Sequence, residues 1–106
     1  MSFNEIDLEP WIISKLQELA AKYKLDELII FGSRADGIAS DVSDVDLAVK
    51  GYKSPVVRSD FEDDVKNLPI LLMFDIVDYD SMLVGDNLRN EIDTNGISLW
   101  TKEHAL

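Results

Sequence analysis

The chain has 106 residues, enough for one compact domain with its own core, so residues 1–106 are expected to form a single domain without a separate substrate-binding domain. Its composition, 46% hydrophobic and 29% charged, is typical of a soluble globular protein, and 21 acidic against 10 basic residues give a formal net charge of −11. So acidic a surface repels phosphate backbones, which excludes a basic face for direct nucleic-acid binding.

The residue inventory removes several site chemistries. The chain has no cysteine, which excludes disulfides, thiol catalysis and Cys-ligated zinc, and which fits a reducing cytoplasm. Its single histidine, His104, is expected to be a solvated residue near the end of the chain. Neither a signal peptide nor an apolar run of ~20 residues is present, so we expect a cytoplasmic protein with no membrane contact.

Hydrophobic periodicity predicts alternating helices and strands in the first half of the chain. Apolar residues at helical spacing predict a helix over residues 10–23, and the wholly apolar run 28–31 predicts a buried central strand. Strict alternation over residues 44–49 predicts a second strand, with Asp44, Asp46 and Ala48 on one face and Val45, Leu47 and Val49 on the other.

Helices and strands also alternate in the second half of the chain. The sequence pattern there predicts a helix over residues 58–68, a strand over residues 70–77 that ends at Asp78, a helix over residues 81–95 stopped by Gly96, and a last strand over residues 97–101. The predicted fold class is α/β (α+β), with helices packed against a small mixed sheet.

A Gly-Ser turn follows the first predicted strand. Gly32 permits close backbone approach to a ligand, Ser33 offers a hydroxyl and an amide, and the start of a predicted short helix would aim free N–H groups at an anion. This pattern favours a phosphate-binding turn, with an ordinary turn as the alternative, and it matches neither the Walker loop nor the dinucleotide fingerprint. Arg34 follows closely enough to touch a phosphate, or it is a surface residue at a helix start.

Three aspartates are candidate metal ligands. Asp44 and Asp46 project from the same strand face about 7 Å apart, and Asp75 interrupts an otherwise apolar strand. If the two strands are neighbours, the three carboxylates can hold one or two Mg²⁺ ions; the alternative is a solvated face. Asp78 and Asp80 lie past the predicted strand end and are expected to be surface or capping groups.

Together these motifs resemble a known superfamily. Gly32-Ser33, ten intervening residues, Asp44-Val45-Asp46 and the later Asp75 resemble the nucleotidyltransferases of the DNA polymerase beta and kanamycin nucleotidyltransferase type. Over its length the chain is similar to a minimal nucleotidyltransferase (MNT) domain, a small protein usually paired with a HEPN-domain partner, in several cases as antitoxin to toxin. The resemblance implies the nucleotidyltransferase fold.

The resemblance also implies roles for individual residues. It implies Mg²⁺-dependent transfer of AMP from ATP to a hydroxyl, with Gly32, Ser33 and Arg34 at the nucleotide and with Asp44, Asp46 and Asp75 as catalytic ligands of two Mg²⁺ ions. Asp75 would help to deprotonate the attacking hydroxyl. The chain departs from the pattern at Asp36, where many relatives have a basic residue, and Lys50 or Lys53 could supply that charge.

Three functions stay open at this stage. The first is a protein adenylyltransferase, an antitoxin that modifies a HEPN-type helical partner within a hetero-oligomer, with a homodimer as a further possibility. The second is a small-molecule nucleotidyltransferase subunit of the antibiotic-modifying type. The third is a non-catalytic antitoxin that acts by binding. An acidic chain suits docking to a basic protein, which favours the first, and the intact Asp44, Asp46 and Asp75 argue against the third.

Overall fold

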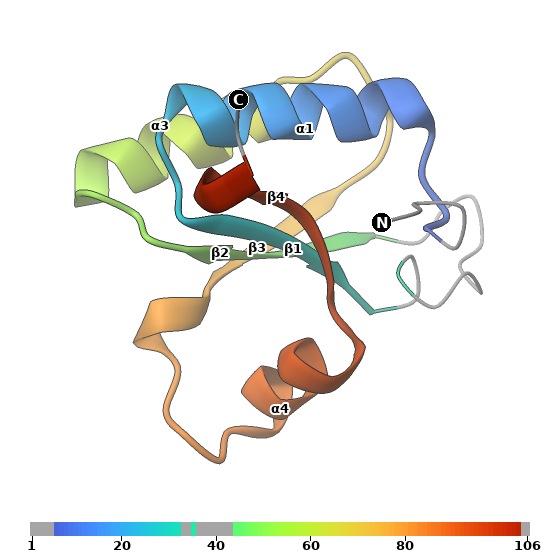
Figure 1. Cartoon of the computed structure of the whole chain (residues 1–106). Helices are drawn as coiled ribbons and strands as arrows, with labels where there is room; N and C mark the ends of the chain where they lie inside the picture. The colour runs from blue at the N-terminus through green and yellow to red at the C-terminus, as the bar shows by residue number, and fades with distance from the viewer. Residues whose placement is uncertain (1–5, 33–34, 36–43, 105–106) are drawn as a thin grey trace.

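Four strands form one mixed sheet in the order β3-β2-β1-β4. The structure, a computed structural model, describes residues 6–32, 35 and 44–104 (Figure 1). Of the short helix predicted after Gly32 and Ser33, the structure describes only Ala35, which is helical and buried. The elements are α1 Pro10–Lys22, β1 Glu27–Phe31, β2 Val45–Lys50, α3 Pro55–Lys66, β3 Phe74–Asp78, η1 Tyr79–Ser81, α4 Asn87–Asn95, β4 Ile97–Thr101 and η2 Lys102–His104.

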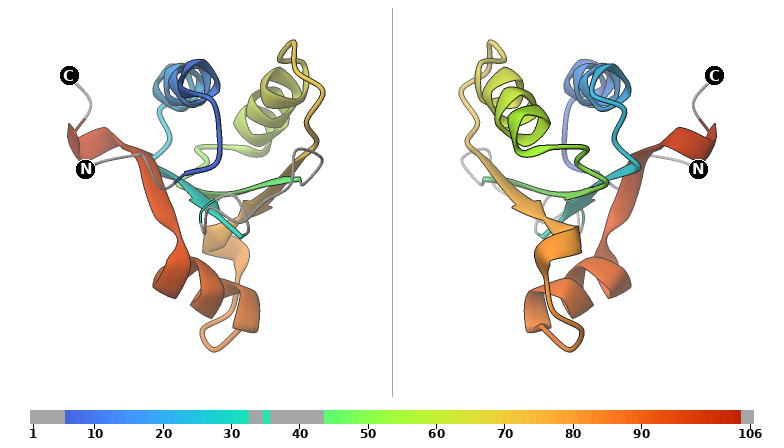
Figure 2. Two further views of the ribbon diagram at one scale, coloured as in Figure 1. Left: turned by 90° about the vertical axis from the view of Figure 1, so that its right-hand side faces the viewer. Right: turned by 90° about the vertical axis from the view of Figure 1, so that its left-hand side faces the viewer.

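Different helices cover the two faces of the sheet (Figure 2). α1 and α3 lie on one face, where the largest part of the core includes the fully buried Leu16, Leu47 and Phe61. α4 and η1 lie on the other face, over a smaller cluster that contains Phe31 and Ile92. Within the described part of the chain, no helix has the length and apolarity to cross a bilayer.

Four of the predicted elements are confirmed. The helix over residues 10–23 is α1, and the strands over 28–31, 44–49 and 97–101 are β1, β2 and β4. In β2 the predicted faces are also correct, because Val45, Leu47 and Val49 belong to the large core while Ala48 belongs to the small cluster. The α/β class with a mixed sheet is confirmed, since β1 pairs antiparallel with β2 and β4 whereas β2 pairs parallel with β3.

The predicted helix over residues 58–68 begins too late. α3 starts at Pro55, and the Ser54 side chain accepts a hydrogen bond of 3.2 Å from the backbone N–H of Val57. Serine at the N-cap followed by proline at the first helical position is a strong start signal, because the hydroxyl satisfies a free N–H and proline has none to lose.

The predicted strand over residues 70–77 also begins too early. β3 starts at Phe74, and the first hydrogen bond to β2 runs from the Val45 N–H to the Met73 carbonyl at 2.8 Å. In the described part of the chain β2 begins at Val45, and the apolar residues before Met73 pair with no described strand. They form a loop in which Ile70 and Leu72 pack against the core.

The predicted helix over residues 81–95 is interrupted. η1 ends at Ser81 and α4 begins at Asn87, with Gly85 between them at φ +91°. This left-handed conformation, which glycine adopts without steric cost, is incompatible with a continuous α-helix. Asp86 then starts α4 by accepting a 2.8 Å hydrogen bond from the Leu88 N–H.

The cap of α3 gives a first testable prediction. Ser54→Ala should lower the free energy of unfolding by about 1 kcal/mol, because the Val57 N–H loses its acceptor. Ser59→Ala, at an exposed position inside the same helix, should change it by less than about 0.5 kcal/mol. Urea denaturation of both variants measures the difference, and equal stabilities would contradict this role of Ser54.

Candidate active site on the beta2 and beta3 strands

Sheet register places two of the predicted site aspartates side by side. Asp46 of β2 is the parallel partner of Asp75 of β3, on strands about 4.8 Å apart. Asp46 is also the antiparallel partner of Phe31 of β1, whose side chain belongs to the small cluster under α4. Because directly paired residues share a face, Asp46 and Asp75 both lie on the α4 face of the sheet.

Asp46 is the half-buried member of the group. Its burial raises the pKa of the carboxyl above the usual value, and the neighbouring carboxylates of Asp75 and Asp44 raise it further. Asp44, immediately before β2, and Asp75 are exposed. Neither hydrogen bonds nor ion pairs link these three side chains to any other described residue. A cation would relieve this repulsion.

Both the backbone conformation at Gly32 and the neighbouring Asp46 side chain favour glycine at this position. Gly32 has φ +76°, a left-handed conformation, and a Cβ at this position would collide with Oδ2 of Asp46. Glycine is therefore required twice, by the backbone and by the carboxylate. Sequence reasoning assigned Gly32 to a phosphate and missed this contact, because only the register of β1 against β2 reveals it.

The donor chemistry of this face fits a divalent cation. Carboxylate oxygens are the ligands that Mg²⁺ prefers, and Asp44, Asp46 and Asp75 supply them from adjoining strands. Within residues 6–32, 35 and 44–104, however, no three acidic or histidine side chains converge into a ready metal-binding cluster. Carboxylates that face one another without a cation repel, which is the physical reason for them to stay apart.

The remaining residues predicted for the nucleotide site either lie outside the described residues or lie far from the site aspartates. Ser33, Arg34 and Asp36 lie outside the described residues. The suggestion that Lys50 or Lys53 supplies a basic group is wrong, because both lie at the opposite end of the β1–β2 hairpin. There Lys50 pairs with Glu27 at 3.4 Å and Lys53 pairs with Asp26 at 2.8 Å.

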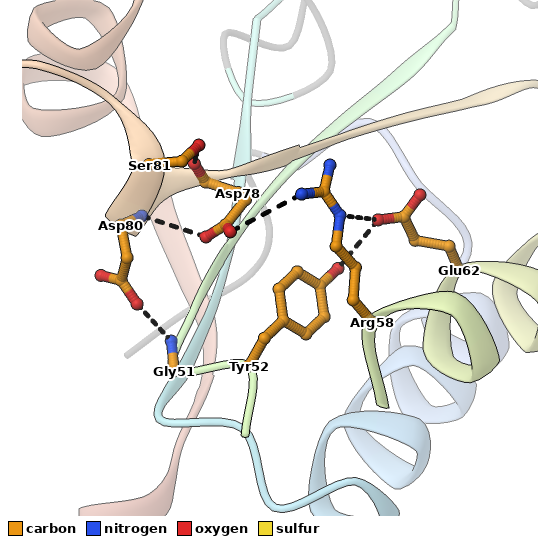
Figure 3. Close-up of polar contacts among 7 residues, drawn as sticks. All are labelled: Gly51, Tyr52, Arg58, Glu62, Asp78, Asp80 and Ser81. Atoms are coloured by element: carbon orange, nitrogen blue, oxygen red, sulfur yellow. Dashed lines mark hydrogen bonds and ion pairs between the residues drawn. The ribbon is translucent and has the colours of Figure 1, made fainter. Parts of the chain in front are cut away.

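A polar network holds the far end of β3 and thereby the strand that carries Asp75. Arg58 of α3 reaches both Glu62, at 2.9 Å, and Asp78, at 3.7 Å (Figure 3). Asp78 also caps η1 by accepting from the Asp80 N–H at 3.2 Å, and the Asp80 carboxylate accepts from the Gly51 N–H at 2.7 Å. The prediction that Asp78 and Asp80 are capping or surface groups is confirmed.

Comparisons with known proteins identify the family and the fold. The family model described as polymerase beta, nucleotidyltransferase matches residues 14–105. A chain in a crystal structure of a toxin–antitoxin with AMP-PNP superposes with a TM-score of 0.69 and 24% identity, over 86% of this chain and 74% of that one. A mutant of the toxin–antitoxin MntA–HpeT gives a TM-score of 0.68 and 22% identity, over the same shares.

A third solved structure extends the likeness beyond toxin–antitoxin pairs. A Sulfolobus solfataricus protein assigned provisionally as a nucleotidyltransferase has a TM-score of 0.55 and 23% identity, over 91% of this chain and 83% of that one. At these identities the structural likeness establishes a shared fold. No curated protein sequence matches the chain significantly.

The family match extends over most of the chain and includes β1, β2 and β3. The chain therefore belongs to the polymerase beta nucleotidyltransferase family, and it is a nucleotidyltransferase. Its fold is shared with the matching chains of the two toxin–antitoxin structures.

Proposed function

We propose that this chain transfers AMP from ATP to a hydroxyl of a protein acceptor, as the antitoxin of a toxin–antitoxin pair whose toxin is a HEPN-type helical protein. The observation that carries the catalytic part is the pairing of Asp46 with Asp75 on one face, with Gly32 packed against the Asp46 carboxylate. The family match supports nucleotidyl transfer, and the two toxin–antitoxin neighbours support a toxin as partner.

Each residue of the site has its own role in the proposed reaction. Asp44, Asp46 and Asp75 hold two Mg²⁺ ions, which neutralise the triphosphate and the charge that develops on the attacking and leaving oxygens. Gly32 lets the backbone approach the triphosphate, with Ser33 and Arg34 as further phosphate contacts. The acceptor oxygen attacks the α-phosphorus, the bond to pyrophosphate breaks, and Asp75 helps to remove the hydroxyl proton.

The charge of the chain supports a protein acceptor. A net charge of −11 attracts a basic partner and speeds its encounter. The site lies where β2 and β3 begin, and Asp75 is exposed on β3, which is an edge strand of the described sheet. A large acceptor can therefore reach it. The cytoplasm, where ATP and Mg²⁺ are available, is the compartment that we propose.

Labelled ATP tests this proposal. The purified chain is incubated with α-labelled ATP, Mg²⁺ and the helical protein encoded beside its gene, with and without EDTA. We expect label on that protein in an EDTA-sensitive reaction, with a mass gain of one or more AMP groups. Label only on an added aminoglycoside would favour the small-molecule enzyme, and tight binding without label would favour the non-catalytic antitoxin.

A further inference from the structure

An apolar groove lies beside the start of α1, away from the carboxylate face. It has a volume of about 470 Å³ and is formed by the segment before and within α1 together with the loop before β3. Its lining is predominantly apolar and includes Leu8, Trp11, Ile12, Ile70, Leu71 and Leu72. This loop is the apolar stretch that sequence periodicity assigned to a strand. Its apolar side chains line the groove and lie outside the described sheet.

Several apolar side chains at the groove remain in water. Leu71 is fully exposed, at 103%, and the indole of Trp11 is 43% exposed. Met73, which follows in the same loop, is 70% exposed and lines an adjoining hollow of about 330 Å³. Apolar groups gathered in this way mark interaction sites, and tryptophan is a common anchor of protein interfaces.

The groove also has a defined charge and a fixed anchor. Glu9 lines it and accepts a 2.5 Å hydrogen bond from the Trp11 Nε1–H, which orients the indole, and the second acidic lining residue is Asp7. With a net charge of −11, a second copy of this chain would bring like charges together. A positively charged partner is attracted instead, by the rim and by the molecule as a whole.

The position of the groove connects it with the proposed active site. The loop before β3 leads directly into the strand that carries Asp75, and Asp46 and Asp75 are each the second residue of their parallel strands. The start of α1, this loop and the starts of both strands lie at the same end of the molecule, on the right in Figure 1. A partner seated in the groove would therefore extend toward the carboxylates.

We propose that this groove docks the acceptor protein through an amphipathic helix, with apolar side chains over Trp11 and Leu71 and with basic side chains facing Glu9. The assignment of the bound protein as acceptor rests on the proposed function. The docking chemistry itself, a cationic amphipathic helix in an apolar groove with an acidic rim, requires neither ATP nor metal.

A synthetic helix tests the docking without nucleotide. A fluorescent peptide of about 18 residues, with leucines on one face and lysines on the other, is titrated with the full chain in EDTA. Leu71→Glu should weaken binding by about tenfold or more, as expected for loss of an apolar anchor. Val84→Glu is the matched control, because Val84 is 87% exposed and lies outside the groove, and it should bind within about twofold of wild type.

Three outcomes would overturn the proposal. These are equal binding by Leu71→Glu and Val84→Glu, equal binding of a peptide with glutamates in place of lysines, and absence of binding to the wild-type chain. Dimerisation of the wild-type chain that Leu71→Glu abolishes would assign the groove to a second copy. Because the titration contains neither ATP nor Mg²⁺, failure of AMP transfer leaves its result unaffected, and the two proposals fail separately.

Discussion

Asp46→Asn should abolish AMP transfer without unfolding the protein. Asparagine keeps the shape of the side chain and removes the charge that a cation would bind. Changes to residues that merely support metal ligands reduce activity by up to about a hundredfold, so we expect loss of a ligand to reduce the transfer rate by more than that. The measurement is the initial rate of labelled AMP transfer at saturating Mg²⁺. The same change at Asp60, an exposed position on α3, is the control and should keep the rate within about twofold.

The stability of Asp46→Asn separates a site residue from a structural one. Burial and two neighbouring carboxylates raise the pKa of Asp46, so its charged form is disfavoured in the folded protein. An acid with a raised pKa destabilises the fold at pH values above that pKa, and the penalty disappears as the pH falls through it. At pH 7 the variant should therefore be at least as stable as wild type, and a clear loss of stability would contradict this account.

Gly32→Ala should destabilise the fold and impair transfer. An alanine at φ +76° costs about 1–2 kcal/mol, and its Cβ would also collide with Oδ2 of Asp46, so the Asp46 carboxylate must move from its position. The collision displaces the candidate metal ligand, so transfer should fall together with stability. Urea denaturation measures the first effect and the labelled-ATP assay the second.

Gly85→Ala is the control for the backbone contribution. Gly85 has φ +91°, and a Cβ there would have no atom within 4 Å, so its replacement carries the conformational cost alone. Gly32→Ala and Gly85→Ala should lose similar stability, because the Asp46 carboxylate can move aside, and only Gly85→Ala should retain transfer activity. Full transfer activity of Gly32→Ala would show that Gly32 and Asp46 do not meet as described.

Local sequence patterns predicted the helices and strands whose hydrophobic periodicity is visible within the segment itself. The alternation in β2 predicted which residues face the large core, because side chains alternate between the two faces of a strand and one face of this strand is wholly apolar. The same reasoning failed at residues 70–73, which are as apolar as a strand but lie before β3 and pair with no strand in the described part of the chain. Strand boundaries depend on the neighbouring strand, which a single segment does not reveal.

The site shows the same division between local and long-range information. Asp44 and Asp46 are close in sequence, and their spacing indicated a paired carboxylate site directly. The sequence placed Asp75 beside Asp46 only on the condition that their two strands are neighbours, and the parallel pairing of β2 with β3 meets that condition. The collision that excludes a side chain from Gly32 depends on a second register, that of β1 against β2, and no local signal encodes it.

Paramagnetic broadening of NMR signals tests the central claim most directly, because it locates the bound cation without needing an acceptor. Mn²⁺ replaces Mg²⁺ in the presence of AMP-PNP, and the backbone amide signals of the chain are recorded. The account predicts that Gly32, Asp46 and Asp75 broaden at the lowest Mn²⁺ concentrations, whereas Glu27 and Lys50, at the opposite end of the β1–β2 hairpin, broaden less. Broadening centred on that opposite end, or absent from Asp46 and Asp75, would contradict the assignment of the nucleotidyl-transfer site to this face.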